Sequence, residues 1–139
     1  MPPDHASDPN GLHPVDLGAR SMLAPLDAGH DRYRVTGYDA EETPQHHRPG
    51  RHEYLMARTA LQSDVLLNLP KLKTHRKAGM TCALKNLVGL NGDKAWLPHH
   101  RAGAVDAGGD EYPCSSPRKE LISRLDYEVD AAGPGARRA

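Results

Sequence analysis

The stretch Val65-Leu66-Leu67-Asn68-Leu69-Pro70-Lys71-Leu72-Lys73-Thr74-His75 decides the fold that we predict for this chain. Its first five residues form a short, mostly apolar run between a predicted helix and a proline. Such a run is typical of a strand that is covered on both faces, as in a parallel α/β sheet. Pro70 ends the strand because proline lacks the N–H group that a β-ladder needs. We therefore expect an α/β fold with a small, mainly parallel sheet, flanking helices and long loops.

Apolar residues at helical spacing predict three helices, over residues 53–62, 78–88 and 118–129. Short strands are predicted at 15–17 and 33–38, where β-forming residues gather. The two ends of the chain, 1–14 and 130–139, are polar and rich in turn-forming residues, so we expect a disordered leader and a disordered tail. The residues between them, 15–129, are expected to form a single α/β domain.

Composition narrows the class of protein. Only 37% of the 139 residues are hydrophobic and there is no Phe, so the core should be thin. No run of about eighteen apolar residues exists, which argues against a membrane-spanning helix. The N-terminus lacks the apolar stretch of a signal peptide, and a cytoplasmic location is the default expectation. Cys82 and Cys114 are too few and too far apart for a disulfide framework or a metal knuckle, and we expect Cys82 to pack as a small buried residue.

Charge is sorted along the chain, although the total is zero. From Leu69 to Arg101 there are seven Lys or Arg residues and one acid, Asp93, which gives a local balance of +6. This excess indicates an anionic partner. With one Trp, five Tyr, no Phe and no zinc-finger spacing, the chain lacks the aromatic platform on which nucleic acids usually stack. We therefore expect an anionic small molecule rather than a nucleic acid.

The cationic loop after the predicted strand is the first part of a candidate site. In open α/β sheets, ligands bind where a strand ends and the next helix begins. Lys71 and Lys73 alternate with Leu72, so both ammonium groups point the same way if the segment is extended. Thr74 offers a hydroxyl group, and His75 is a candidate acid or base because imidazole titrates near neutrality. The alternative interpretation is a solvated, charged loop without a ligand.

The following helix and loop supply further candidates. Lys85 and Asn86 lie one turn after Thr81 and are predicted to line the pocket. Lys85 is a ligand-holding charge or, if it is desolvated, a catalytic base. Lys94, in the Gly/His-rich loop that follows, is a further ligand-binding candidate. Alternatively, the Lys85 side chain lies along the helix with its ammonium group in water.

A metal site is a weaker alternative in the same region. His99 and His100, together with His75 and Asp110, provide groups that can bind a metal ion. However, two adjacent histidines are not metal-ligand spacing by themselves, because neighbouring side chains in an extended chain diverge. We therefore assign no metal ligands, and the sequence does not identify a cofactor.

Three motifs in this region occur in order and together resemble the Domain of Unknown Function 362 family. They are Leu69-Pro70-Lys71-Leu72-Lys73-Thr74-His75, then Thr81-x-x-Leu84-Lys85-Asn86-Leu87-x-Gly89, and then Gly92-Asp93-Lys94-x-x-Leu97-Pro98-His99-His100-Arg101. The resemblance covers roughly residues 15 to 128.

The family has no established general reaction, so the resemblance implies little about chemistry. Some relatives carry an appended ferredoxin-like iron–sulfur module, but this chain has no such cysteines and we expect no cluster on it. Family members are typically longer, which implies an incomplete domain here. Our leading hypothesis is an enzyme domain that acts on an anionic small molecule. The alternatives are a non-catalytic binding or assembly module, and an inactive fragment of a longer protein.

Overall fold

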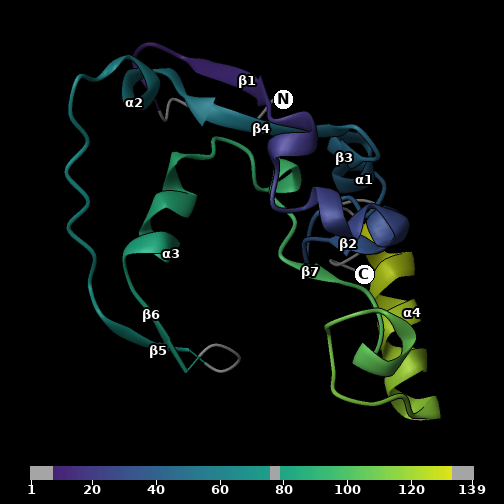
Figure 1. The fold of residues 1–139 in the computed structure, drawn as a ribbon. Coiled ribbons are helices and arrows are strands. Elements are labelled where there is room, and N and C mark those ends of the chain that lie inside the picture. The colour runs from purple at the N-terminus through teal and green to yellow at the C-terminus, as the bar shows by residue number, and fades with distance from the viewer. Residues whose placement is uncertain (1–7, 76–78, 133–139) are drawn as a thin grey trace. The chain divides into compact units, whose positions relative to one another are not determined.

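A computed structural model describes residues 8–75 and 79–132 of the chain (Figure 1). It contains helices, strands and segments of 3-10 helix. The helices are α1 (Glu42–His46), α2 (Arg58–Gln62), α3 (Ala83–Leu87) and α4 (Pro117–Ala131). The strands are β1 (Leu12–Asp16), β2 (Tyr33–Arg34), β3 (His47–Arg48), β4 (Arg51–Ala57), β5 (Lys73–His75), β6 (Gly79–Thr81) and β7 (His100–Arg101). The 3-10 segments are η1 (Gly18–Arg20), η2 (Ala24–Arg32), η3 (Val88–Leu90), η4 (Lys94–Trp96) and η5 (Val105–Ala107).

The chain divides into two compact units. Unit 1 comprises Met1–Val15 and Leu55–Gly92, and unit 2 comprises Asp16–Tyr54 and Asp93–Ala139. The boundaries therefore fall within β1, within β4, and between η3 and η4. In the described residues, no helix combines the length and the apolar composition that crossing a membrane requires.

The sheets are small and their strands pair antiparallel. Strands β1, β4 and β3 lie side by side in that order, while β2 pairs with β7 and β5 pairs with β6. Backbone hydrogen bonds from Leu17 to His52 and from Arg58 to Gly11 flank the β1–β4 pair, as antiparallel register requires. The prediction of a mainly parallel sheet is therefore wrong.

The error lies in the apolar run Val65–Leu69, which is not a strand. Val65, Leu67 and Leu69 are 73%, 79% and 85% exposed. A parallel neighbour requires a crossover connection of about a dozen residues or more, and α2, the helix before this run, has five residues. Apolar composition alone therefore could not distinguish a buried strand from an exposed extended segment.

The helix predicted over 53–62 is also wrong in its first half. Residues Arg51–Ala57 form β4 instead, and the helix begins only at Arg58. Here, pairing with the neighbouring strands overrides the helical spacing of the apolar residues. In addition, Pro49 and Gly50 join β3 to β4, with Gly50 at φ +78° as a type II turn requires at its third position.

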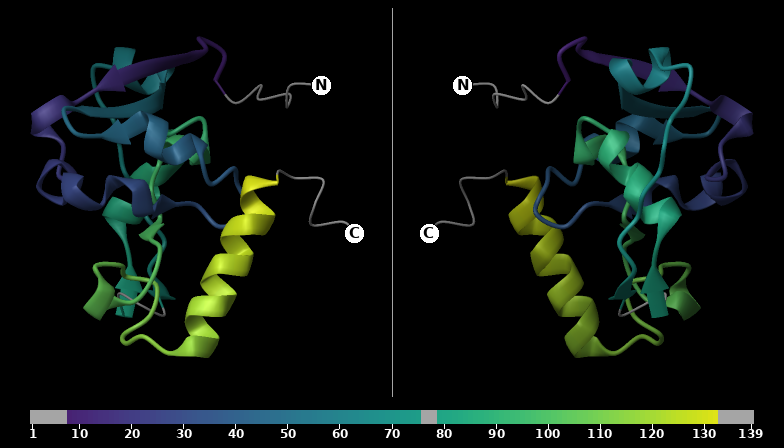
Figure 2. Two further views of the ribbon diagram at one scale, coloured as in Figure 1. Left: turned by 90° about the vertical axis from the view of Figure 1, so that its right-hand side faces the viewer. Right: turned by 90° about the vertical axis from the view of Figure 1, so that its left-hand side faces the viewer.

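Of the helix predicted over 78–88, residue 78 lies outside the described residues and only Ala83–Leu87 forms an α-helix, α3. Gly79 has φ +72°, which is outside the helical region, and Gly79–Thr81 pairs with β5 as a hairpin. By contrast, the helix predicted over 118–129 is confirmed as α4, which Figure 2 shows as one unbroken helix. Ser116 accepts a hydrogen bond from the Lys119 N–H and Pro117 opens the first turn, which is favourable at a helix start.

The core of unit 2 is built around aromatic and polar side chains. The largest fully buried side chains are Tyr33, His47, His52 and Thr43, and the buried aliphatic residues are small apart from Val35. His47 Nε2 donates to the carbonyl oxygen of Trp96 over 2.8 Å, whereas its Nδ1 is buried without a partner among the described residues. His47 therefore joins β3 to η4 in its neutral form.

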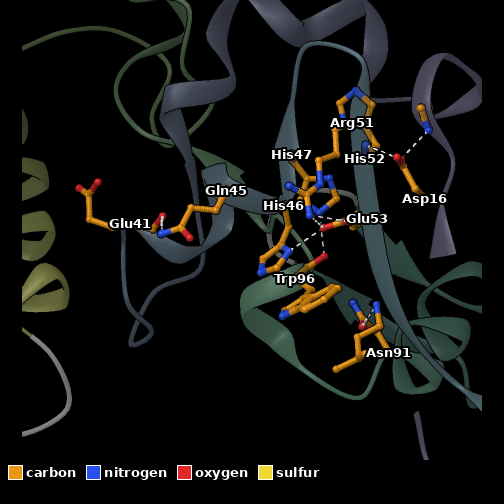
Figure 3. A network of polar contacts seen from close by, with 12 residues as sticks. Asp16, Glu41, Gln45, His46, His47, Arg51, His52, Glu53, Asn91 and Trp96 are labelled. Atoms are coloured by element: carbon orange, nitrogen blue, oxygen red, sulfur yellow. Dashed lines mark hydrogen bonds and ion pairs between the residues drawn. The ribbon is translucent and has the colours of Figure 1, made fainter. Parts of the chain in front are cut away.

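Polar contacts surround the imidazole rings of His47 and His52 (Figure 3). Asp16 Oδ1 accepts from the N–H groups of His52 and Gly18, and these bonds lower the pKa of Asp16. Nearby, His46 stacks on Trp96 with 3.6 Å between ring centroids, and its Nδ1 lies 3.0 Å from Glu53 Oε2. The elements of unit 2 are thus held together as much by polar contacts as by apolar burial.

Unit 1 has no comparable core. None of its described residues is fully buried, and its large apolar side chains from Val65 to Leu87 are mostly exposed. Its segments are held by β-pairing and by side-chain hydrogen bonds instead. We therefore expect unit 1 to open at a lower free energy than unit 2.

Acidification should destabilise unit 2 through His47. Burial, the largest cause, lowers the pKa of His47 below its ordinary value of 6.5, and the neighbouring His52 and His46 act in the same direction. The unfolded chain therefore binds a proton more readily than the folded chain. The stability contributed by neutral His47 is complete above pH 6.5 and is lost as the pH falls below that value.

The measurement is urea unfolding at pH 7.5 and at pH 5.5. His47→Gln keeps a donor for the Trp96 carbonyl but does not titrate, so its loss of stability between the two pH values should be smaller than that of the wild type. Exposed His99, changed to Gln, is the matched control and should behave as the wild type does. Equal pH dependence in wild type and His47→Gln would contradict this account.

Candidate functional site

Unit 1 contains a cavity of about 340 Å³ with a basic wall. The segment Lys71–Lys73, β6 and α3 contribute to it, together with the 3-10 turn after α3. Its lining residues are Lys71, Lys73, Thr81, Cys82, Lys85, Asn86, Val88 and Gly89. Four of the predicted site residues therefore surround one space: Lys71, Lys73, Lys85 and Asn86.

The β5–β6 hairpin explains how Lys73 reaches this cavity. Lys73 pairs with Thr81 across the hairpin, and directly opposed side chains lie on the same face of a ribbon. Both residues line the cavity, so this face is the site face. Thr74 pairs with Met80 and belongs to the other face because side chains alternate along a strand.

Asn68 ties the extended segment to α3 and sets the position of Asn86. The Asn86 Nδ2 group donates to Asn68 Oδ1 over 2.8 Å, and Asn68 Nδ2 donates to the Ala83 carbonyl oxygen over 2.8 Å. Sequence reasoning overlooked Asn68, although a single amide within an apolar run is an available signal. The Asn68 bridge holds Asn86 and the neighbouring Lys85 on the side of α3 that carries the cavity.

The site has an unbalanced positive charge. Between Val65 and Gly92 the sequence contains five Lys or Arg residues and no Asp or Glu. Within the described part of the chain, no carboxylate lies at ion-pair distance from Lys71, Lys73 or Lys85. Ammonium groups that share one cavity without a counter-charge repel one another, and a bound anion would relieve that repulsion.

The predicted strand, loop and helix arrangement of this site is wrong. A hairpin follows Lys71, and α3 begins only at Ala83, after β6. The five-residue α3 does not supply a helix N-terminus next to the lysines. Instead, the hairpin brings Lys73 beside Thr81, and the return of the chain through α3 adds Lys85.

Three other predicted ligand or catalytic residues are placed elsewhere. Thr74 and His75 lie in β5 but do not line the cavity, and His75 pairs with Gly79 at the hairpin end. Lys94 belongs to unit 2, where its Nζ lies 6.0 Å from the centroid of the Tyr38 ring. Catalytic roles for His75 and Lys85 stay predictions.

The candidate metal ligands do not form a cluster in the described residues. No group of three or more His, Cys, Asp or Glu side chains there is arranged to hold a metal ion. His99 Nδ1 contacts the Leu97 carbonyl oxygen at 2.7 Å, while Asp110 accepts from the Arg101 N–H. His100 pairs with Arg34 in the β2–β7 ribbon.

Cys82 is not the small buried residue that we expected from the sequence. It is exposed and lies at the end of β6, where it forms part of the cavity wall. The prediction assumed a helix over 78–88 that would bury one side of the segment. With β6 and α3 in its place, that burial is absent.

Comparisons with known proteins point to one family. No curated protein and no solved structure matches the chain. Residues 17–129 match the family described as Domain of unknown function (DUF362), and this range includes both the basic cavity and most of unit 2. The chain therefore belongs to the DUF362 family.

Proposed function

We propose that the basic cavity of unit 1 binds a small molecule that carries a phosphate or carboxylate group. The observation that supports this is the gathering of Lys71, Lys73 and Lys85 around one cavity, in a segment without any acid. A cavity of about 340 Å³ is at the lower end of the range typical of small-molecule sites. The proposed ligand is therefore small, with most of its binding energy in its charged group.

The lining residues have complementary roles in this proposal. Lysine ammonium groups are compact point charges with three donors each, so several of them can surround one oxyanion. Thr81 and Asn86 add neutral hydrogen-bonding groups on the same wall. Lys85 is the residue that we propose as a catalytic group, if the bound molecule reacts, because it lines the cavity whereas His75 does not.

Substitution of individual lysines tests the proposal. Lys73→Gln and Lys85→Gln should each weaken binding of inorganic phosphate or citrate about tenfold or more, because each removes a charged hydrogen-bond donor. Lys94→Gln, in unit 2, is the matched control and should bind as the wild type does. Isothermal titration calorimetry at low ionic strength measures the affinities, and circular dichroism checks the fold of each variant. Equal affinities in all four proteins would refute the lysine site.

The exposed apolar residues favour a second candidate function, a binding or assembly module. Val65, Leu67, Leu69 and Leu72 are each more than half exposed, in a segment where the chain is also strongly basic. Apolar side chains gathered in this way often mark a protein interface.

Sedimentation velocity over a range of ionic strength separates the two functions. An assembly surface of this kind should give a concentration-dependent rise in sedimentation coefficient that Leu67→Ser and Leu69→Ser together abolish. A protein that stays monomeric at 0.1 mM in both low and moderate salt, with or without these substitutions, would exclude self-assembly. Charge-driven association alone would weaken as salt shortens the screening length to about 8 Å.

A further inference from the structure

Unit 2 contains a separate cavity of about 330 Å³ in which arginines dominate the lining. Arg32, Arg34 and Arg124 line it, with Tyr112 and Tyr127 beside them. Glu120 is the one acid among its lining residues. This cavity shares no residue with the basic cavity of unit 1, so any ligand it takes is independent of the function proposed above.

Two elements of unit 2 build its walls. Arg32 is the last residue of η2, Arg34 lies in β2, and Tyr33 stands between them. Side chains alternate along an extended chain, so Arg32 and Arg34 lie opposite the buried Tyr33 side chain. The second wall is one face of α4, where residues three and four apart are neighbours. Glu120, Ser123, Arg124 and Tyr127 follow that spacing.

The guanidinium group of Arg34 is held rigidly. Its Nη1 donates to the carbonyl oxygens of Asp31 and Tyr33, over 2.7 Å in each case. Its Cζ lies 4.7 Å from the centroid of the Tyr127 ring, as in a cation–π contact. The group is therefore oriented before any ligand arrives, which lowers the entropy cost of binding.

The same group lacks a full set of partners. Nε is buried and has no hydrogen-bond partner among the described residues, and no carboxylate there pairs with Arg34. Arg34 Nη2 also makes no hydrogen bond to the described residues, and, unlike Nε, it is not buried. A charged donor thus remains available at the cavity.

The charges of the lining residues are not balanced among themselves, although Glu128, Glu111 and Glu41 lie next to Arg124, Ser123 and Tyr127. Arg32 donates to the carbonyl oxygen of Ala107, which carries no net charge. Arg124 lies 3.9 Å from Glu128, but both side chains are more than half exposed, and such surface pairs contribute little. Three arginines and one glutamate leave the lining with an excess of two positive charges.

Nearby hydroxyl and carboxylate groups are already engaged. The Ser123 hydroxyl donates to Glu111 Oε2 over 2.7 Å, and the Gly103 N–H donates to the same oxygen over 3.0 Å. The Tyr127 hydroxyl donates to Glu41. The guanidinium donors left for a ligand are therefore Arg34 Nη2 and the N–H groups of Arg124, which form charge-assisted hydrogen bonds with carboxylate or phosphate oxygens.

We propose that this arginine cavity is a second binding site, and that it takes a small molecule through a carboxylate or phosphate group bound by Arg34 and Arg124. Arg34 is the fixed anchor and Arg124 closes the site from α4. The rings of Tyr112 and Tyr127 border the space beside the charged group and therefore restrict the size of the ligand.

Arginine side-chain NMR tests this site directly. The buried Nε–H of Arg34 is shielded from water and serves as the reporter. Inorganic phosphate and citrate are titrated separately, in the wild type and in the Lys73→Gln and Lys85→Gln double variant. A saturable shift of the Arg34 Nε–H signal in both proteins is the expected result, and the anion that binds more tightly identifies the preferred group.

A matched pair of variants on α4 provides the second arm. Arg124→Gln should raise the dissociation constant about tenfold, whereas Arg118→Gln, on the same helix but outside the cavity lining, should leave it unchanged. Arg32→Gln replaces Arg124→Gln if the latter does not fold. The proposal is overturned if the Arg34 Nε–H signal of the wild type does not shift or shifts without saturation. It is also overturned if this signal no longer shifts in the lysine double variant, or if Arg124→Gln and Arg118→Gln give the same dissociation constant.

Discussion

The burial of His47 is the interaction on which unit 2 depends most. This chain has no Phe, and the buried aliphatic residues in the described part of the chain are Val35 and three alanines. An imidazole fills the space that a larger aliphatic side chain would occupy, and its hydrogen bond to the Trp96 carbonyl joins β3 to η4. Burying an imidazole ring costs less free energy when the ring is uncharged and hydrogen-bonded, so this core is tied to the protonation state of one ring.

His52 extends this arrangement to the first part of unit 2. Its ring is fully buried 5.7 Å from that of His47, and its Nε2 lies 3.0 Å from Asp27 Oδ1 in η2, although the two atoms do not form a hydrogen bond. Its backbone N–H donates to Asp16. Three separate segments therefore converge on the β3–β4 hairpin, and the arginine cavity is built on elements of the same unit.

Unit 1 shows the opposite balance of burial and charge. Its apolar residues are exposed, its described residues include none that is fully buried, and its lysines share a cavity without a carboxylate. Binding regions are often drawn from the least stable parts of a protein. In our account, the anion that the lysines bind also supplies order that a hydrophobic core does not provide.

Sequence reasoning succeeded where the signal was local. The 3.6-residue spacing of apolar residues predicted α4. The density of positive charge drew attention to lysines that line the unit 1 cavity, although their role as a ligand site stays a prediction. It failed at Val65–Leu69, because an apolar run does not reveal whether a neighbouring strand exists to cover it. The arginine cavity was not predicted either, since Arg34 and Arg124 are ninety residues apart and only the tertiary fold brings them together.

The most direct test of the account is hydrogen exchange of backbone amides, measured by NMR with and without inorganic phosphate. We predict that β5 and β6 amides exchange through low-energy opening in the absence of phosphate, and that saturating phosphate slows their exchange while the β3–β4 amides change little. Exchange in β5 and β6 that is already as slow as in β3–β4, or that is unchanged by phosphate at saturation, would contradict the account.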